Sequence, residues 1–62
     1  MFQIRLFCSE APGSKLLDKQ YGSEASAETA AFYLLGVKTP NGIVCATHVV
    51  DQVGALVSEF EF

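Results

Sequence analysis

The residues of this chain whose types could support catalysis are two cysteines, a histidine and a nearby aspartate. A thiol, an imidazole and a carboxylate can act together as nucleophile, base and orienting group. Cys45 and His48 are an odd number of positions apart, so in one strand their side chains would point to opposite faces. Asp51 lies at a turn position, where its side chain is expected to bond to its own backbone. We therefore expect that the chain is not an enzyme and that Cys8 and Cys45 are buried as small apolar residues.

The chain shows none of the spacings that are typical of metal, phosphate or nucleic-acid sites. No His or Cys pattern suits zinc, and Gly22-Ser23 is too short a signal for a phosphate cradle, so no metal and no cofactor are predicted. The four basic residues are scattered along the chain: Arg5, Lys15, Lys19 and Lys38. With a net charge of −3 and no basic patch, the chain is not expected to bind nucleic acid.

The cysteines and the apolar segments indicate a cellular setting. Arg5 interrupts the apolar stretch at the N-terminus and Glu10 follows it, a pattern unlike that of a secretory leader. No apolar run approaches the roughly 20 residues that are needed to span a bilayer. Two cysteines without a dense framework suit a reducing compartment. We expect a cytoplasmic protein that does not bind membranes.

The size and apolar content of the chain predict self-association. The 62 residues are expected to form one domain, residues 1–62, and 50% of them are apolar. A chain this short buries only about 60% of the surface that its unfolded form exposes. Apolar surface should therefore remain exposed in a monomer, and oligomerisation is a standard remedy where no metal or disulfide framework is present. We predict a homodimer, and a different protein is the second partner that this reasoning allows.

Residues 23–36 are expected to form the helix around which the fold is organised. Ser23 suits the N-cap, and Gly36 suits the left-handed turn that closes a helix. The apolar residues of this segment fall on a single stripe: Ala27, Ala30, Ala31, Leu34 and Leu35. Phe32 and Tyr33 flank the stripe, so both rings are expected to lie partly buried at the edge of the core. The alternative is that one of them marks a contact surface.

The segments before the helix predict a hairpin. Residues 2–8 alternate between apolar and polar side chains, with Phe7 as the exception on the polar face. Residues 15–21 are expected to return as an edge strand, with helix as the alternative. Three side chains of this strand would face inward: Leu17, Lys19 and Tyr21. An inward lysine discourages unwanted pairing, as is typical of sheet edges.

The segments after the helix predict two further strands. Residues 39–42 suit a type I turn that ends in a glycine with positive φ. Residues 43–50 are apolar on both faces, which predicts a central strand or one whose second face meets a partner. The expected faces are Ile43, Cys45, Thr47 and Val49 against Val44, Ala46, His48 and Val50. Residues 51–62 match strand and helix spacing, and their valines and Glu-Phe alternation favour strand. The predicted fold class is α+β, a small antiparallel sheet with one helix packed on one face in the order β-β-α-β-β.

Such a fold implies no function by itself, so the function must come from the surface. Phe60 and Phe62 either close the core of the monomer or anchor a partner at an edge strand, with Glu59 and Glu61 on the other face. We expect a small non-enzymatic protein-interaction domain. Its predicted contact residues are Phe7, Phe32, Tyr33, His48, Phe60 and Phe62.

The sequence suggests a class of protein partner and leaves two other functional hypotheses open. Compact acidic domains without motifs are common among phage and mobile-element products, including inhibitors, so the partner could be a host protein that this chain modulates. The alternative to protein binding is a small-ligand module with a pocket between two protomers, lined by Tyr33, Phe7 and His48. The third hypothesis is an enzyme that uses a cysteine thiol and His48.

Overall fold

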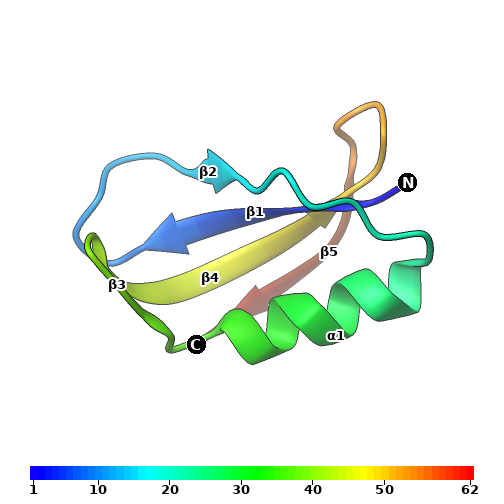
Figure 1. The fold of residues 1–62 in the computed structure, drawn as a ribbon. Coiled ribbons are helices and arrows are strands. Elements are labelled where there is room, and N and C mark those ends of the chain that lie inside the picture. The colour runs from blue at the N-terminus through cyan, green and yellow to red at the C-terminus, as the bar shows by residue number, and fades with distance from the viewer.

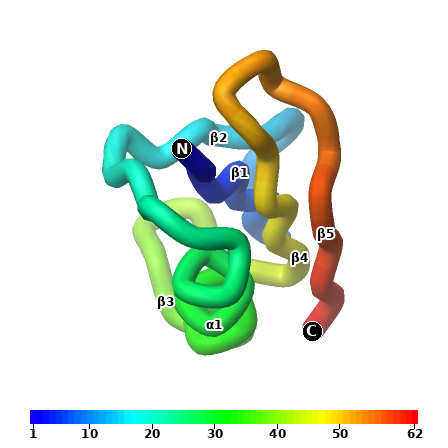
Figure 2. Tube along the Cα trace, turned by 90° about the vertical axis from the view of Figure 1, so that its right-hand side faces the viewer, coloured from blue at the N-terminus to red at the C-terminus, as the bar shows by residue number.

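The computed structural model describes residues 1–62 and shows an antiparallel sheet with one helix across one of its faces (Figures 1 and 2). The helix α1 spans Glu24–Leu34. The strands are β1 (Gln3–Cys8), β2 (Lys15–Leu16), β3 (Lys38–Thr39), β4 (Gly42–Val50) and β5 (Leu56–Glu61). The strand order is β2-β1-β4-β3, and β5 pairs with β4. The predicted α+β class and β-β-α-β-β order are confirmed, with the short strand β3 as an addition.

β4 is the central strand, as its two apolar faces predicted. β1 pairs with one edge of β4 along almost its whole length. The other edge is shared, because β3 pairs with Gly42 and Ile43 while β5 pairs with residues 46–50. The turn that precedes β4 also matches its prediction, since Gly42 has a φ of 93° and pairs with Thr39.

A β-bulge in β4 corrects the predicted faces of this strand. The register with β1 skips Cys45, because Val44 and Ala46 oppose consecutive residues of β1. The extra residue shifts the alternation by one position, so Val44 lies on the same face as Thr47 and Val49. A period of two cannot detect this shift, because the bulge is set by pairing with a strand far away in the sequence.

The segment that follows the first turn departs from the predicted edge strand. Only Lys15–Leu16 form a strand, and the ladder ends at Leu17. The Gln3 side-chain amide donates to the Leu17 carbonyl at 3.2 Å, and the Leu17 N–H donates to the Ile4 carbonyl at 2.8 Å. The chain then leaves the sheet and returns at Tyr21, which forms an isolated bridge with Phe2. The Leu17 carbonyl therefore accepts from the Gln3 side chain, whereas in a continuous ladder its partner would be a backbone N–H.

The helix packs closely on β4 because its inner face consists of alanine. The Ser23 hydroxyl caps α1 by accepting from Ser26 N–H at 3.2 Å, as predicted. Ala27 and Ala31 are completely buried and form the core with Ile4 and Val49. The Thr47 hydroxyl, also fully buried, donates to the Ala31 carbonyl at 3.0 Å. This bond satisfies the only buried polar side chain in the centre of the fold.

Much apolar surface remains uncovered on this chain. Only 7 of the 62 residues are buried. Phe32 and Tyr33 are 59% and 75% exposed, so both rings lie farther outside the core than the helix pattern predicted. The other exposed large apolar residues are Met1, Leu16, Val37, Val53, Leu56 and Phe62. The single helix does not have the length and apolar character that a membrane-spanning helix needs.

The alanine face of α1 predicts a specific response to larger side chains. We expect Ala31→Leu to lower the free energy of unfolding by about 1–3 kcal/mol, because the added atoms have no space between α1 and β4. Ala25→Leu makes the same change at an exposed position of the same helix and should change stability by less than about 0.5 kcal/mol. Urea unfolding followed by circular dichroism measures both, and equal effects would contradict the close packing.

Candidate interaction site

β5 leaves one of its two edges unpaired. It pairs only with β4, and its six residues make it the longest strand with an open edge, since β2 and β3 have two residues each. The Phe62 N–H donates to the Cys45 carbonyl at 2.9 Å. Because backbone groups alternate in direction along an antiparallel strand, the N–H and C=O groups of Glu59 and Glu61 point away from β4. These groups are free to bond to another strand. Figure 2 shows β5 at the margin of the molecule.

The side of β5 that faces the helix carries Ser58, Phe60 and Phe62. The Ser58 hydroxyl donates to the Glu28 carboxylate of α1. Phe60 is half-buried and packs against the core, whereas Phe62 is 76% exposed. The Phe62 ring covers Gly36, where an added Cβ would lie 2.6 Å from a ring carbon. The sequence offered two roles for Phe60 and Phe62, closing the core or staying exposed at the edge. Phe60 closes the core, and Phe62 stays exposed.

Four of the six predicted contact residues meet at the end of the helix. Phe32 lies between two other rings, with its centroid 5.9 Å from that of Tyr33 and 6.3 Å from that of Phe60. Both pairs are close to perpendicular, at 75° and 74°, which is a favourable edge-to-face arrangement. Phe32, Tyr33 and Phe62 also line one shallow depression. We call Phe32, Tyr33, Phe60 and Phe62 the aromatic patch.

The other two predicted contact residues lie together on the opposite face of the sheet. The Phe7 ring is 4.6 Å from the His48 ring, centroid to centroid, at an angle of 59°. His48 Nε2 is 3.5 Å from Glu59 Oε2 of β5. Arg5 pairs with His48 from β1 and donates from its guanidinium to the Ser14 hydroxyl at 3.1 Å. Within one chain, Tyr33 is therefore separated by the sheet from Phe7 and His48, with which it was predicted to line a pocket.

The candidate catalytic residues each have a separate partner. The Cys45 thiol donates to the Phe7 carbonyl at 3.2 Å, and His48 contacts Glu59. The Asp51 carboxylate accepts from the backbone N–H groups of residues 53 and 55, at 3.0 and 2.9 Å, so it closes its own turn as predicted. Both cysteines are half-buried and unpaired, which leaves them less enclosed than the sequence predicted.

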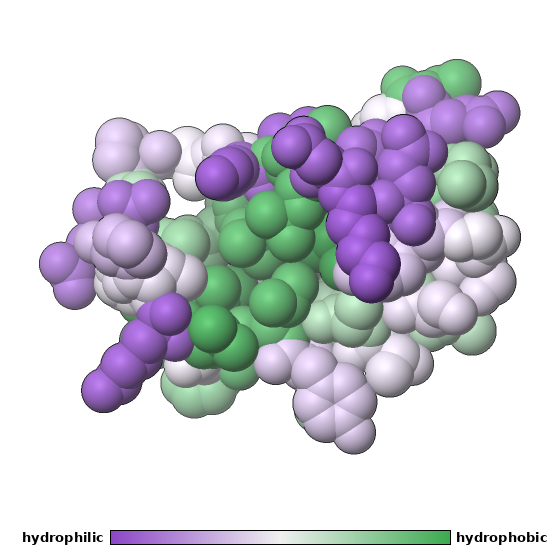
Figure 3. Space-filling view, viewed as in Figure 1, coloured by the Kyte–Doolittle hydropathy of each residue, from purple (hydrophilic) through white to green (hydrophobic).

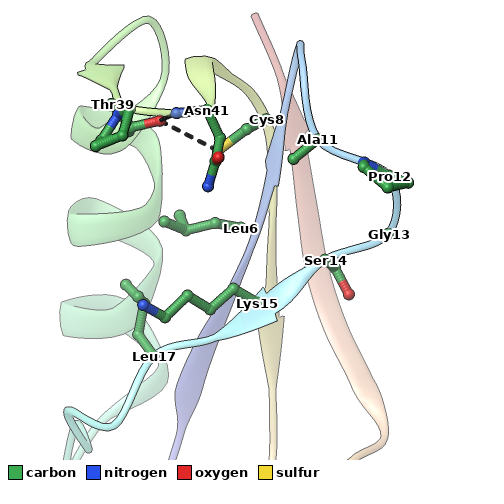
Figure 4. A pocket seen from close by; sticks show the side chains of 11 residues that line it. Leu6, Cys8, Ala11, Pro12, Gly13, Ser14, Lys15, Leu17, Thr39 and Asn41 are labelled. Carbon is green, nitrogen blue, oxygen red and sulfur yellow. Dashed lines mark hydrogen bonds between the residues drawn. The ribbon is translucent and has the colours of Figure 1, made fainter.

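A hollow that the sequence did not predict lies at the C-terminal end of β1. It has a volume of about 380 Å³ and lies between the loop after β1 and the turn before β4. Figure 4 shows Leu6 in its middle, with Cys8, Thr39 and Asn41 at one end and Lys15 at the other. Hydrophobic surface is visible in the middle of this side of the molecule (Figure 3). The hollow depends on two turns that are far apart in the sequence, so no local pattern signals it.

Comparisons of the chain with protein-family models, with curated proteins and with solved structures found no match. Function is therefore inferred from the geometry of this chain alone. Its most extended surface for another polypeptide is the open edge of β5, with the aromatic patch on one side and Glu59 and Glu61 on the other. We call this combination the β5 site.

The different burial of the two terminal rings predicts different effects on stability. We expect Phe60→Ala to lower the free energy of unfolding by about 2 kcal/mol, less than for a fully buried phenylalanine because Phe60 is half-buried. Phe62→Ala should cost less than about 1 kcal/mol, because its ring is mostly in contact with water. Thermal unfolding of both variants measures the difference. Equal losses would show that Phe62 belongs to the core.

Proposed function

We propose that this chain is a small non-enzymatic protein-interaction domain that binds an extended segment of another polypeptide along β5. The observation that carries this proposal is the six-residue open edge of β5. An unpaired edge is a template for a further strand, because each outward N–H and C=O gains a backbone partner when the strand is added.

The aromatic patch supports the same proposal. Strand addition uses backbone bonds for affinity and flanking side chains for specificity. Phe32, Tyr33 and Phe62 present large exposed rings directly beside the edge. Aromatic residues are enriched at protein interfaces, where they contribute area at a low entropic cost. A bound strand would cover these rings and the open edge of β5 together.

The homodimer that the composition predicts stays a prediction. Eight large apolar side chains are exposed, as expected for a chain that cannot bury its apolar residues alone. One chain has a mass of 6.7 kDa. Light scattering that gives twice this mass at micromolar concentration would establish the dimer, and the mass of a single chain would exclude it.

The hollow beside Leu6 favours small-ligand binding as a second candidate function. Its volume of about 380 Å³ lies within the range of roughly 300–1,000 Å³ that is usual for ligand sites. It lies within one chain, so it differs from the pocket between protomers that the sequence suggested. Screening of a fragment library by amide shifts tests this candidate, and shifts that group around Leu6, Leu17 and Asn41 would support it.

Replacement of Glu59 by proline tests the proposal. The Glu59 N–H points away from β4, so a proline there should keep the sheet intact while it removes a donor for the added strand. Peptides are first selected from a random display library on the unmodified protein. We expect Glu59→Pro to weaken their binding about tenfold or more, and Glu59→Thr, which keeps the N–H, to weaken it far less.

Two measurements keep this test decisive. Amide spectra show whether Glu59→Pro is folded, and Glu61→Pro, which removes the next outward N–H, replaces it if it is not. Selected peptides that bind the proline and threonine variants equally well, or that shift amides away from β5, would contradict strand addition.

A further inference from the structure

The charges along β5 indicate what kind of segment can occupy it. We infer that the partner segment alternates lysine or arginine with large apolar residues and belongs to a different protein. This inference rests on the proposed strand addition at the β5 site and adds the chemistry of the partner and its distinction from a second copy.

The pairing of β5 assigns a different chemistry to each of its faces. Glu59 pairs with His48 and Glu61 pairs with Ala46, so both glutamates lie on the sheet face away from α1. Phe60 pairs with Thr47 on the helix side. Side chains of a strand added outside β5 would continue these rows, because directly opposed residues share a face. Alternate partner residues would therefore lie beside the carboxylates, and those between them beside the aromatic patch.

The carboxylates of this face are only partly compensated within the chain. The contact between His48 and Glu59 is the only one between a basic and an acidic side chain that the structure contains. Arg5, the one fixed cation in this row, pairs with His48 and donates to Ser14. Glu61 faces the row of Ala46 and Phe7, which carries no charge. Both glutamates are exposed at the open edge, so a basic side chain of the partner would meet unneutralised negative charge.

The same charges oppose edge-to-edge pairing of two copies. A two-fold, antiparallel pairing centred on the C-terminal half of β5 would place Glu59 and Glu61 of both copies on one face. Like charges that are directly opposite each other destabilise a strand pair. Charged side chains along an open edge also protect natural sheets against self-pairing. The edge therefore suits a basic segment of another chain better than its own copy.

Three peptides of the length of β5 test this inference. In each peptide, apolar residues alternate with one variable residue type. The apolar residues are valines with one central phenylalanine, and the variable residue is lysine, threonine or glutamate. We expect the lysine peptide to bind about threefold to tenfold more tightly than the threonine peptide, with the glutamate peptide weakest. All binding peptides should shift the amides of Glu59 and Glu61. The preference for lysine should decrease as the salt concentration rises, because exposed charges are screened.

A charge-reversed variant provides the matched test. Glu59→Lys combined with Glu61→Lys should invert the order of the lysine and glutamate peptides. Glu10→Lys combined with Asp18→Lys changes the net charge by the same amount at exposed positions outside β5, and should keep the original order. Both variants are checked for an intact fold by their amide spectra.

The possible outcomes separate this inference from the proposed function. Binding at β5 that does not depend on peptide charge would overturn the inference and leave strand addition in place. If no peptide shifts the β5 amides, both are wrong. A dimeric mass that falls to that of one chain in Glu59→Pro would identify a second copy as the occupant and would overturn the inference.

Discussion

The contact between the alanine face of α1 and β4 is the constraint on which the rest of this structure depends. Ala27 and Ala31 are completely buried against Ile4 and Val49, and the Thr47 hydroxyl bonds to the Ala31 carbonyl. Small side chains let the helix approach the sheet closely, but they also add little volume to the core. A domain of this size gains its stability from a narrow line of contacts, and larger apolar side chains remain at its margins.

The position of the helix decides where those margins are. α1 lies mainly over β4, with fewer contacts to β1 and β5. The rings at the end of α1 and β5 therefore meet outside the core and form the aromatic patch. Toward the other side, the sheet surface around Leu6 stays partly uncovered and forms the hollow. Both candidate sites thus result from one helix that is too narrow to cover the whole face of the sheet.

The β5 site differs from a plain hydrophobic patch because its two faces carry different chemistry. The helix side offers aromatic rings, and the opposite side offers Glu59 and Glu61. A strand added to this edge has a defined register, because a slip by one residue would move its apolar side chains beside the carboxylates. In the proposed complex, the carboxylates would oppose pairing between copies, while the backbone groups would bond to a complementary segment.

The sequence by itself determined the features that depend on neighbours in the chain. The Ser23 cap, the positive φ of Gly42, the turn at Asp51 and the alternation of residues 58–62 follow from local chemistry, and the structure contains each of them. The predicted alternation is wrong at the start of β5, because Leu56 and Ser58 oppose consecutive residues of β4 and Val57 forms a bulge. Only the tertiary structure decided the bulge at Cys45, the end of the ladder at Leu17 and the strand β3, because each depends on pairing between distant segments. The types of the six predicted contact residues were visible in the sequence, but their division into two groups on opposite faces of the sheet was not. That division depends on the register between strands and on the path of the helix over them, which local spacing does not encode.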